Sequence, residues 1–188
     1  MKISLGPQTL IYPNPVLIVG SYDNAGKANV MTAAWGGIVC SDPPCVSVSL
    51  RKATYTFGNI AERKAFTISI PSEHHVKEAD HFGIKSGRNE DKFSMTRLTP
   101  VKSEIVDAPY VKEFPVVLEC RLLHMHELGL HTQFVGQIMD VKIEEDVAGE
   151  GGRPDIRKIR PFVYDHSSMA YYGIGGVVGK AFKIGNEL

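Results

Sequence analysis

The fold is decided by one alternating stretch, Cys45-Val-Ser-Val-Ser-Leu-Arg51. Its apolar side chains, Val46, Val48 and Leu50, occupy every second position, and other side chains fill the positions between them. A period of two places the two sets on opposite faces of a β-strand. We therefore predict a strand with one face in a hydrophobic core and the other face against something polar.

Strand patterns also precede this stretch. An apolar run from Val16 to Tyr22 and a second run from Lys27 to Trp35 flank Asp23-Asn-Ala-Gly26, whose residues favour a turn. Together they predict a β-hairpin. We expect Gly36-Gly37 to break the second strand, and Asp42-Pro-Pro44 to form a rigid stop before residue 45.

Further strands follow in the second half. Residues 65–70 alternate again, and Pro71 ends them. Two long runs, Pro115–Glu127 and Leu130–Ile143, predict a second hairpin around Gly129. Residues 162–164 predict a last short strand.

Helical patterns are few and short. Apolar residues with helical spacing at 57, 60 and 61 predict a helix with Thr54 or Thr56 as its N-cap. Ser72 and Asn89 are the predicted N-caps of two more short helices, which run to about Phe82 and Met95. Strand pairs dominate, so the pattern favours a mainly β fold, an antiparallel Greek-key barrel with a few short helices, over a doubly wound α/β sheet.

The composition and length of the chain exclude several classes of function. The chain has 188 residues, and its 21 Lys and Arg balance its 21 Asp and Glu, so its formal net charge is zero. A nucleic-acid-binding protein usually carries an excess of basic charge, so we expect no nucleic-acid partner. This length predicts a single domain over residues 1–188. With no secretion signal and no apolar run of spanning length, we expect a cytoplasmic protein without a membrane partner.

Common nucleotide-binding motifs are absent. The sequence Gly173-Ile-Gly-Gly-Val-Val-Gly179 resembles a dinucleotide fingerprint, but a valine stands at its last glycine position and no βαβ unit can follow it. No P-loop and no GxSxG nucleophile motif occurs. The three cysteines, Cys40, Cys45 and Cys120, form no zinc or CxxC pattern.

The histidines suggest one alternative function. His124 and His126 share a face of a predicted strand, and His131 follows the turn. Three imidazoles on a barrel wall can hold a metal ion, so a metal-dependent barrel enzyme is one hypothesis. Polar residues on a half-exposed strand are the simpler interpretation, because no fourth ligand is evident.

The strongest chemical signal lies between residues 29 and 56. Ser47 and Ser49 present hydroxyls on the same face as Arg51, and Lys52 and Thr54 follow at the predicted start of a helix. The N-terminus of a helix attracts anions, and a guanidinium can bind a phosphate through two hydrogen bonds. These residues alone predict an anion site. A barrel without catalysis, whose polar face meets solvent or a protein partner, remains an alternative.

Ordered blocks of sequence add a family resemblance. The blocks are Asn29-Val-Met-Thr-Ala-Ala-Trp35, Ser41-Asp-Pro-Pro44, Val46–Lys52 with Thr56 and Asn59-Ile60, and residues 130–137. With them the chain resembles the flavin reductase-like family of FMN-binding split barrels over nearly its whole length. Within that family it is most similar to the flavoredoxins, which are small FMN electron carriers.

The resemblance implies a set of cofactor-binding residues and no catalytic side chain. It implies that residues 29–32 contact the isoalloxazine ring, that residues 47–50 border the ring and the ribityl chain, that residues 51–56 bind the phosphate, and that two later residues reach the cofactor. The implied residues are Asn29, Val30, Met31, Thr32, Ser47, Val48, Ser49, Leu50, Arg51, Lys52, Thr54, Thr56, Lys92 and His131.

The resemblance also implies partners. Proteins of this family form homodimers with FMN at the subunit interface, so a second chain is expected to complete each site. The expected function is FMN-dependent electron transfer with a redox partner protein or NAD(P)H. An NAD(P)H-dependent FMN reductase is the main alternative within the family.

Overall fold

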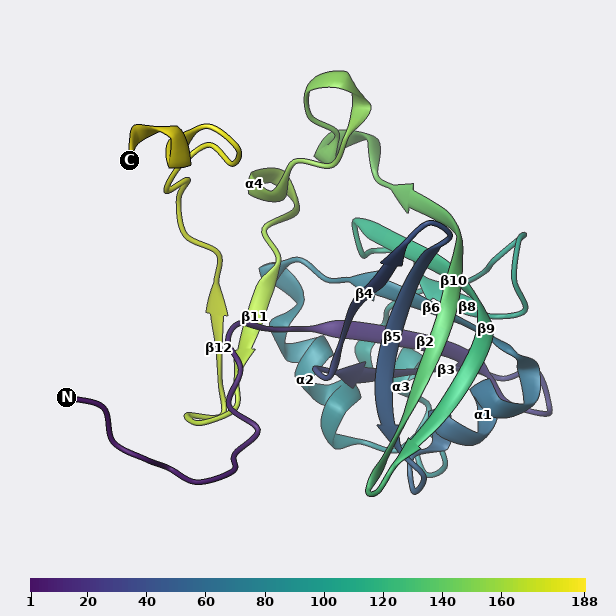
Figure 1. Ribbon diagram of the computed structural model, residues 1–188. Helices are drawn as coiled ribbons and strands as arrows, with labels where there is room; N and C mark the ends of the chain where they lie inside the picture. Colours follow the sequence, from purple (N-terminus) through teal and green to yellow (C-terminus); the bar gives the residue numbers. More distant parts are fainter.

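A computed structural model describes residues 1–188, and a seven-stranded antiparallel sheet forms its centre (Figure 1). The order of the strands is β3-β2-β6-β9-β10-β5-β4. Their bounds are β2 (Leu17–Tyr22), β3 (Ala28–Ala33), β4 (Gly36–Ser41), β5 (Pro44–Arg51), β6 (Ala65–Ile70), β9 (Val116–Leu128) and β10 (His131–Ile143). The predicted mainly β fold is confirmed.

The sheet curls into a barrel that stays open along one side. No ladder of hydrogen bonds joins the edge strand β3 to β5. The backbone N–H of Ser49 donates to the carbonyl oxygen of Trp35, at 2.8 Å, which extends the β4–β5 pairing by one residue toward the end of β3. The barrel is therefore split along β3.

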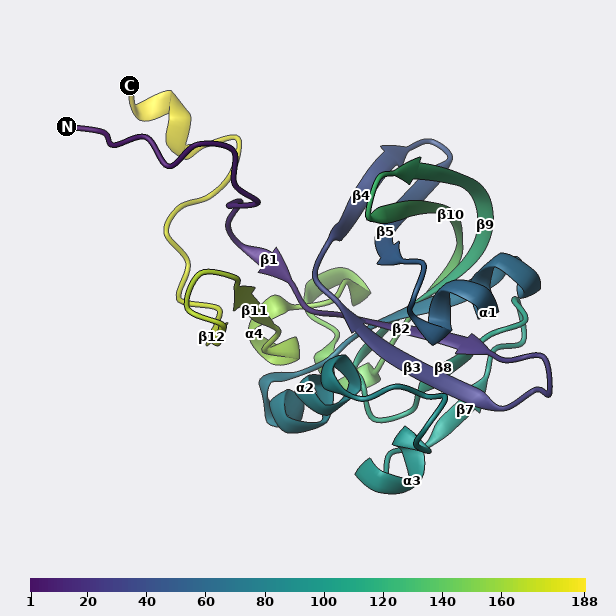
Figure 2. The same cartoon turned by 90° about the horizontal axis from the view of Figure 1, so that it is seen from below.

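Smaller elements surround the barrel. A three-stranded sheet contains β1 (Asn14–Pro15), β11 (Phe162–Asp165) and β12 (Ala170–Gly173), and a two-stranded sheet contains β7 (Pro100–Lys102) and β8 (Pro109–Val111). The α-helices are α1 (Tyr55–Arg63), α2 (Val76–Ile84), α3 (Lys92–Thr96) and α4 (Ile156–Ile159). Figure 2 shows α1 on the barrel side of the β2–β3 hairpin, and α2 and α3 on its opposite side. No helix is long and apolar enough to span a membrane.

Two hydrophobic cores explain the sequence patterns. The alternating residues Val46, Val48 and Leu50 point into the barrel core together with Phe66 and Phe134, as predicted. A second core, which includes Val30 and Phe82, lies between the sheet and helices α2 and α3. Because β2 contributes to both cores, its sequence is a continuous apolar run without alternation.

The predictions of helix caps and strand ends were partly correct. Thr54 caps α1 as predicted, since its hydroxyl accepts a hydrogen bond from the backbone N–H of Phe57. The second strand ends at Ala33, just before Gly36-Gly37, but these glycines also begin a further strand, β4, which the sequence did not predict. Ser72 precedes only a 3₁₀ turn and caps nothing with its side chain. Asn89 does not cap α3. Asp91 does, by accepting from the backbone N–H of Ser94.

Candidate functional site

A cavity of about 280 Å³ lies in the region where the barrel is split. Its walls come from β3, from the segment that joins β5 to α1, from the end of α2 with the following loop, and from α3. Its lining residues are Asn29, Met31, Arg51, Ala53, Thr54, Tyr55, Thr56, Phe82, Gly83, Ile84, Lys85, Ser86, Gly87 and Lys92. Six of them are among the residues predicted from sequence, and we call this space the split cavity.

The N-terminus of α1 opens onto the split cavity. The first N–H groups of a helix have no partner within the helix, and the first turn of α1 contains no acidic residue. Arg51 stands beside this turn, and its exposed guanidinium makes none of the side-chain hydrogen bonds or ion pairs in the structure. Free N–H groups next to an unpaired guanidinium favour an anion such as a phosphate.

Asn29 brings an unsatisfied acceptor to the same cavity. Its amide nitrogen donates to the hydroxyl of Thr56 at 2.9 Å, while its Oδ1 is buried and has no hydrogen-bond partner. A buried acceptor left unpaired costs about 1–3 kcal/mol. Because Asn29 lines the cavity, a bound molecule with hydroxyl or N–H donors would satisfy this atom. Gly87 allows the close packing, since a Cβ at that position would overlap Oδ1.

Lys92 is a buried cation in the wall of the split cavity. Its ammonium group donates to the carbonyl oxygens of Val30 and Phe82, both at 2.8 Å, and the residue is 4% exposed. Burial lowers the pKa of Lys92 to about 8, against a smaller opposite effect of Glu90. The amine therefore retains a positive charge at neutral pH, close to the cavity and to the edge of β3.

The other predicted residues lie around the split cavity without lining it. Val30, Val48 and Leu50 are buried in the two hydrophobic cores. The hydroxyl of Thr32 donates to the carbonyl of Ala79, and Thr32 lines a neighbouring cavity of about 280 Å³ that shares Gly83 and Ile84 with the first.

Four predicted residues on or near β5 and β10 have partners of their own. Ser47 is buried and accepts a hydrogen bond from Gln133, and the backbone N–H of Ser49 donates to the carbonyl oxygen of Trp35. Lys52 forms an exposed ion pair with Glu127, with Nζ 2.7 Å from Oε1. His131 lies directly opposite Arg51 in the β5–β10 ladder and outside the split cavity.

Sequence reasoning missed the third wall of the cavity. Residues 82–87, from the end of α2 and the loop after it, contribute six lining residues, and Tyr55 contributes an aromatic ring. The glycines at 83 and 87 were a usable signal, because a glycine often marks a close approach of the backbone to a ligand or another chain segment. From the sequence, residues 83–87 are only the connection between the two short helices predicted after Ser72 and Asn89.

The histidine alternative has no geometric support. The rings of His124 and His126 lie side by side on β9, with centroids 5.8 Å apart. No group of three or more His, Cys, Asp or Glu side chains is arranged to hold a metal ion.

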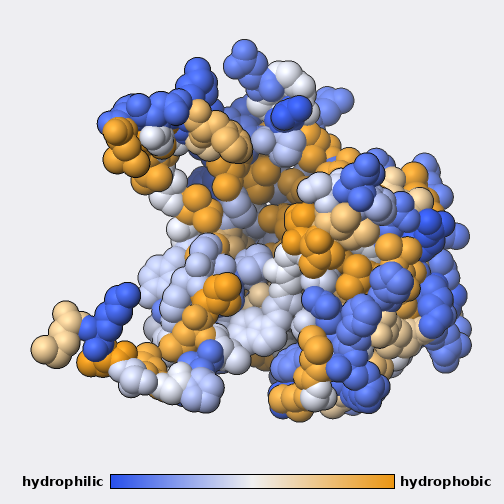
Figure 3. Space-filling model, in the orientation of Figure 1, coloured by the Kyte–Doolittle hydropathy of each residue, from blue (hydrophilic) through white to orange (hydrophobic).

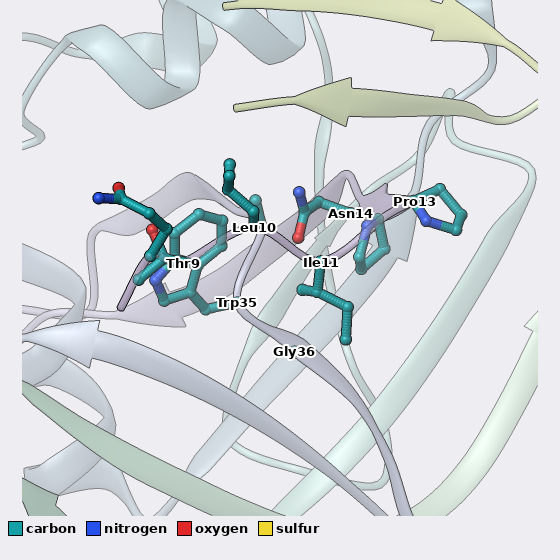
Figure 4. A pocket seen from close by; sticks show the side chains of 10 residues that line it. Thr9, Leu10, Ile11, Pro13, Asn14, Trp35 and Gly36 are labelled. Atoms are coloured by element: carbon teal, nitrogen blue, oxygen red, sulfur yellow. The ribbon is translucent and has the colours of Figure 1, made fainter. Parts of the chain in front are cut away.

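A larger cavity of about 460 Å³ lies under the N-terminal arm (Figure 4). Residues 8–11 and 13–15 form one side of it, and Ala34, Trp35 and Gly36 form the other. The arm is attached to the small sheet through a hydrogen bond between the hydroxyls of Tyr12 and Ser167, at 2.5 Å. No charged side chain lines this cavity, so it lacks the features of an anion site.

Comparison with known proteins establishes the family. Residues 9–173 match the flavin reductase like domain, and the chain belongs to the flavin reductase-like family. A protein of Archaeoglobus fulgidus is 35% identical over 147 residues, which cover 78% of this chain and 80% of that protein.

Two solved structures carry a more specific name. Flavoredoxin of Desulfovibrio vulgaris (Miyazaki F) is 54% identical, with a TM-score of 0.94, over 98% of this chain and all of that chain. Flavoredoxin from Methanosarcina acetivorans is 32% identical, with a TM-score of 0.93, over 100% of this chain and 98% of that chain. The predicted family and the predicted similarity to flavoredoxins are confirmed.

The buried charge of Lys92 predicts a pH-dependent stability. Its folded pKa of about 8 lies below the ordinary value of 10.5, so the unfolded chain binds more protons between these values. The cost of burying the ammonium is fully present below pH 8 and disappears as the pH rises to 10.5. Relative to Lys92→Met, wild type should gain about 3 kcal/mol of unfolding free energy across that window.

Urea unfolding at several pH values measures this difference. Lys102→Met is the matched control, because Lys102 is exposed on β7, and its difference from wild type should stay constant. A Lys92→Met difference that is equally constant would contradict a buried, charged lysine.

Proposed function

We propose that this chain binds FMN in the split cavity and transfers electrons between a reductant and a redox partner, as a single flavin domain over residues 1–188. One observation carries the proposal: Arg51, the first turn of α1 and the unpaired Oδ1 of Asn29 all face one cavity. The similarity to flavoredoxins over nearly the whole chain supports the same function.

The residues of the cavity fit the phosphate and the ribityl chain of FMN. Arg51 and the N–H groups at the start of α1 would bind the phosphate, with Thr54 and Thr56 supplying hydroxyls. A ribityl hydroxyl is a suitable donor for Asn29 Oδ1. Lys52 would contribute at longer range, because its ammonium is paired with Glu127.

The ring of FMN would lie along the edge of β3. Residues 29–32 and Ser47 to Leu50 would border it, mainly through backbone atoms, because Val30, Val48 and Leu50 point into the cores. When bound, FMN supplies one- and two-electron transfer, and the protein contributes orientation, solvent exclusion and nearby charge. Lys92 would supply that charge, since its buried ammonium is held at the edge of β3. The expected position of His131 is beside the ring.

A homodimer is part of the proposal. The split cavity of about 280 Å³ is slightly smaller than the roughly 300–1,000 Å³ of most small-molecule sites. Part of FMN would therefore extend beyond one chain. The edge strand β4 exposes Ile38 and Val39, and Figure 3 shows apolar side chains along the terminal arms and around the hollow between them and the barrel. Exposed apolar surface of this kind favours association with another chain.

Arg51→Ala tests the cofactor site. We expect the purified variant to retain about tenfold less FMN than wild type after dialysis, because a charge-assisted bond to phosphate contributes about 1.5–3 kcal/mol. Absorption of the bound flavin and its bleaching by dithionite are the measurements. Arg121→Ala is the control, since Arg121 is exposed on β9 outside the cavity. A colourless wild type that cannot be loaded with FMN would refute the proposed function.

Ile38→Asp tests the dimer. A charge on the edge of β4 should shift the mass in solution from two chains toward one and weaken FMN binding. Light scattering after size exclusion measures the mass. Ile105→Asp is the control, because Ile105 is exposed to a similar degree but lies in the loop between β7 and β8. A wild type with the mass of one chain would exclude the dimer.

NADH and NADPH oxidation distinguishes a carrier from a reductase. A carrier should oxidise neither nucleotide rapidly in the presence of free FMN, because its natural electron donor is another protein. Absorbance at the nicotinamide band follows the reaction. Turnover in the usual enzymatic range of about 1–1,000 per second would instead identify an NAD(P)H-dependent FMN reductase.

A further inference from the structure

Two of the three cysteines lie opposite each other in the central sheet. Strands β4 and β5 run side by side and are joined at one end by a tight turn at Asp42 and Pro43 (Figure 1). In this ladder Cys40 is the direct partner of Cys45, one residue pair away from the turn. Neither thiol lines the split cavity, so the proposed FMN site leaves both without a role.

The register of the two strands places this pair within the range of a disulfide. Directly opposite residues of an antiparallel pair have Cα atoms about 4.5–5.5 Å apart, and their side chains share one face of the sheet. A disulfide needs Cα atoms about 4.4–6.8 Å apart. The turn contains Pro43, and Pro44 follows it, and their fixed φ angles limit how far the two strand ends can separate. Cys40 and Cys45 are therefore held close together.

The two thiols differ in their access to solvent. Cys40 is exposed on the edge strand β4, and its Sγ donates a weak hydrogen bond to the carbonyl oxygen of Asp42, at 3.3 Å. Cys45 is 3% exposed. A small oxidant in solution therefore reaches Cys40 first, while Cys45 is sheltered beside it. An accessible cysteine next to a second cysteine that can resolve it is the usual arrangement of a redox-sensitive thiol pair.

Cys120 is not a partner for either thiol. It lies on β9, and β10 separates β9 from β5. Neighbouring strands are about 4.7–4.9 Å apart, so two such spacings exceed the Cα separation that a disulfide allows. Cys120 is also 0% exposed, and burial raises its pKa to about 12. Since the thiolate is the reactive form, Cys120 stays a thiol and serves as an internal control.

We propose that Cys40 and Cys45 are a peroxide-sensitive pair that forms a reversible disulfide. The Cys40 thiolate attacks one oxygen of a hydroperoxide. The O–O bond breaks, the sulfur becomes a sulfenic acid, and the second oxygen leaves as water or an alcohol with the proton of the thiol. The sulfur of Cys45 then attacks the sulfenic sulfur. The S–S bond forms, the S–O bond breaks, and hydroxide leaves as water with the Cys45 proton.

The electrons balance in this sequence. Two thiols lose two electrons, and the O–O bond of the hydroperoxide takes them up. A dithiol restores the reduced pair by thiol–disulfide exchange. The disulfide would tie the end of the edge strand β4 to β5. The inference is independent of the proposed function, because the reaction needs no flavin.

Peptide mapping after oxidation tests the proposal. The reduced full-length protein is treated with an equimolar amount of hydrogen peroxide, the remaining thiols are alkylated in denaturant, and the chain is digested with trypsin. Cys40 and Cys45 lie together in the tryptic peptide 28–51, and Cys120 lies in the peptide 113–121. Peptide 28–51 should carry no alkyl group and be lighter by two hydrogen atoms, and dithiothreitol before alkylation should restore both thiols. The Cys120 peptide should be alkylated throughout.

Serine variants assign the two roles. Cys45→Ser should lose the disulfide and accumulate a sulfenic acid on Cys40, which dimedone traps. Cys40→Ser should lose both the disulfide and the dimedone adduct, because no accessible thiol remains. Cys120→Ser is the matched control and should form the disulfide as wild type does. Circular dichroism shows whether each variant folds, and the mapping of wild type decides the proposal even where a variant does not.

Other products from wild type would overturn the proposal. If both cysteines of peptide 28–51 are still alkylated after oxidation, the pair does not react with peroxide. If Cys40 is a sulfinic acid and Cys45 is alkylated, Cys45 does not resolve the sulfenic acid. A bond between the Cys40 residues of two chains, visible on a non-reducing gel as a band of twice the mass, would make the disulfide a link between copies. A bond from Cys45 to Cys120 would contradict the partners that the strand register predicts.

Discussion

The ammonium of Lys92 joins the two layers on which the site depends. β3 is an edge strand, and Phe82 lies in the last turn of α2, where carbonyl groups have no partner within the helix. Lys92 donates to the carbonyl oxygens of both Val30 and Phe82. Buried carbonyls need partners, and one buried amine serves both. The bond to β3 stabilises the open edge of the barrel without covering it with another strand. The split cavity is the space that this arrangement leaves.

Charge is organised locally in a chain with no net charge. Arg51 and Lys92 face the split cavity, whereas the neighbouring Lys52 is neutralised by Glu127 and Asp91 is paired with Lys27. Ion pairs thus neutralise Lys52 and Asp91 near the site, whereas the guanidinium of Arg51 has no ionic partner. Since exposed pairs contribute only about 0–1 kcal/mol, their main effect here is on which cations remain available to an anion.

The sequence predicted the elements whose signals are local. The alternating pattern at residues 45–51 predicted that Val46 and Val48 point into the core, and both do. Thr54 was a predicted N-cap, and its hydroxyl caps α1. Such signals can be recognised from a residue and its immediate neighbours in the chain. Asn89 and Asp91 are both good N-caps, so composition could not choose between them, and packing of Phe93 into the second core fixed the start of α3 at Lys92.

The parts of the site that escaped prediction depend on contacts between distant segments. Residues 82–87 line the split cavity because α2 packs on β3. The glycines at 83 and 87 signal a close approach, but they do not tell which distant segment approaches. Asn29 looked like an ordinary strand residue, yet its amide bonds Thr56 and its Oδ1 lies against Gly87. A side chain held this way cannot rotate to satisfy its acceptor with water, because the atom is buried. The unmet acceptor is a property of three segments brought together, and it supports the proposal of a ligand site at the split cavity.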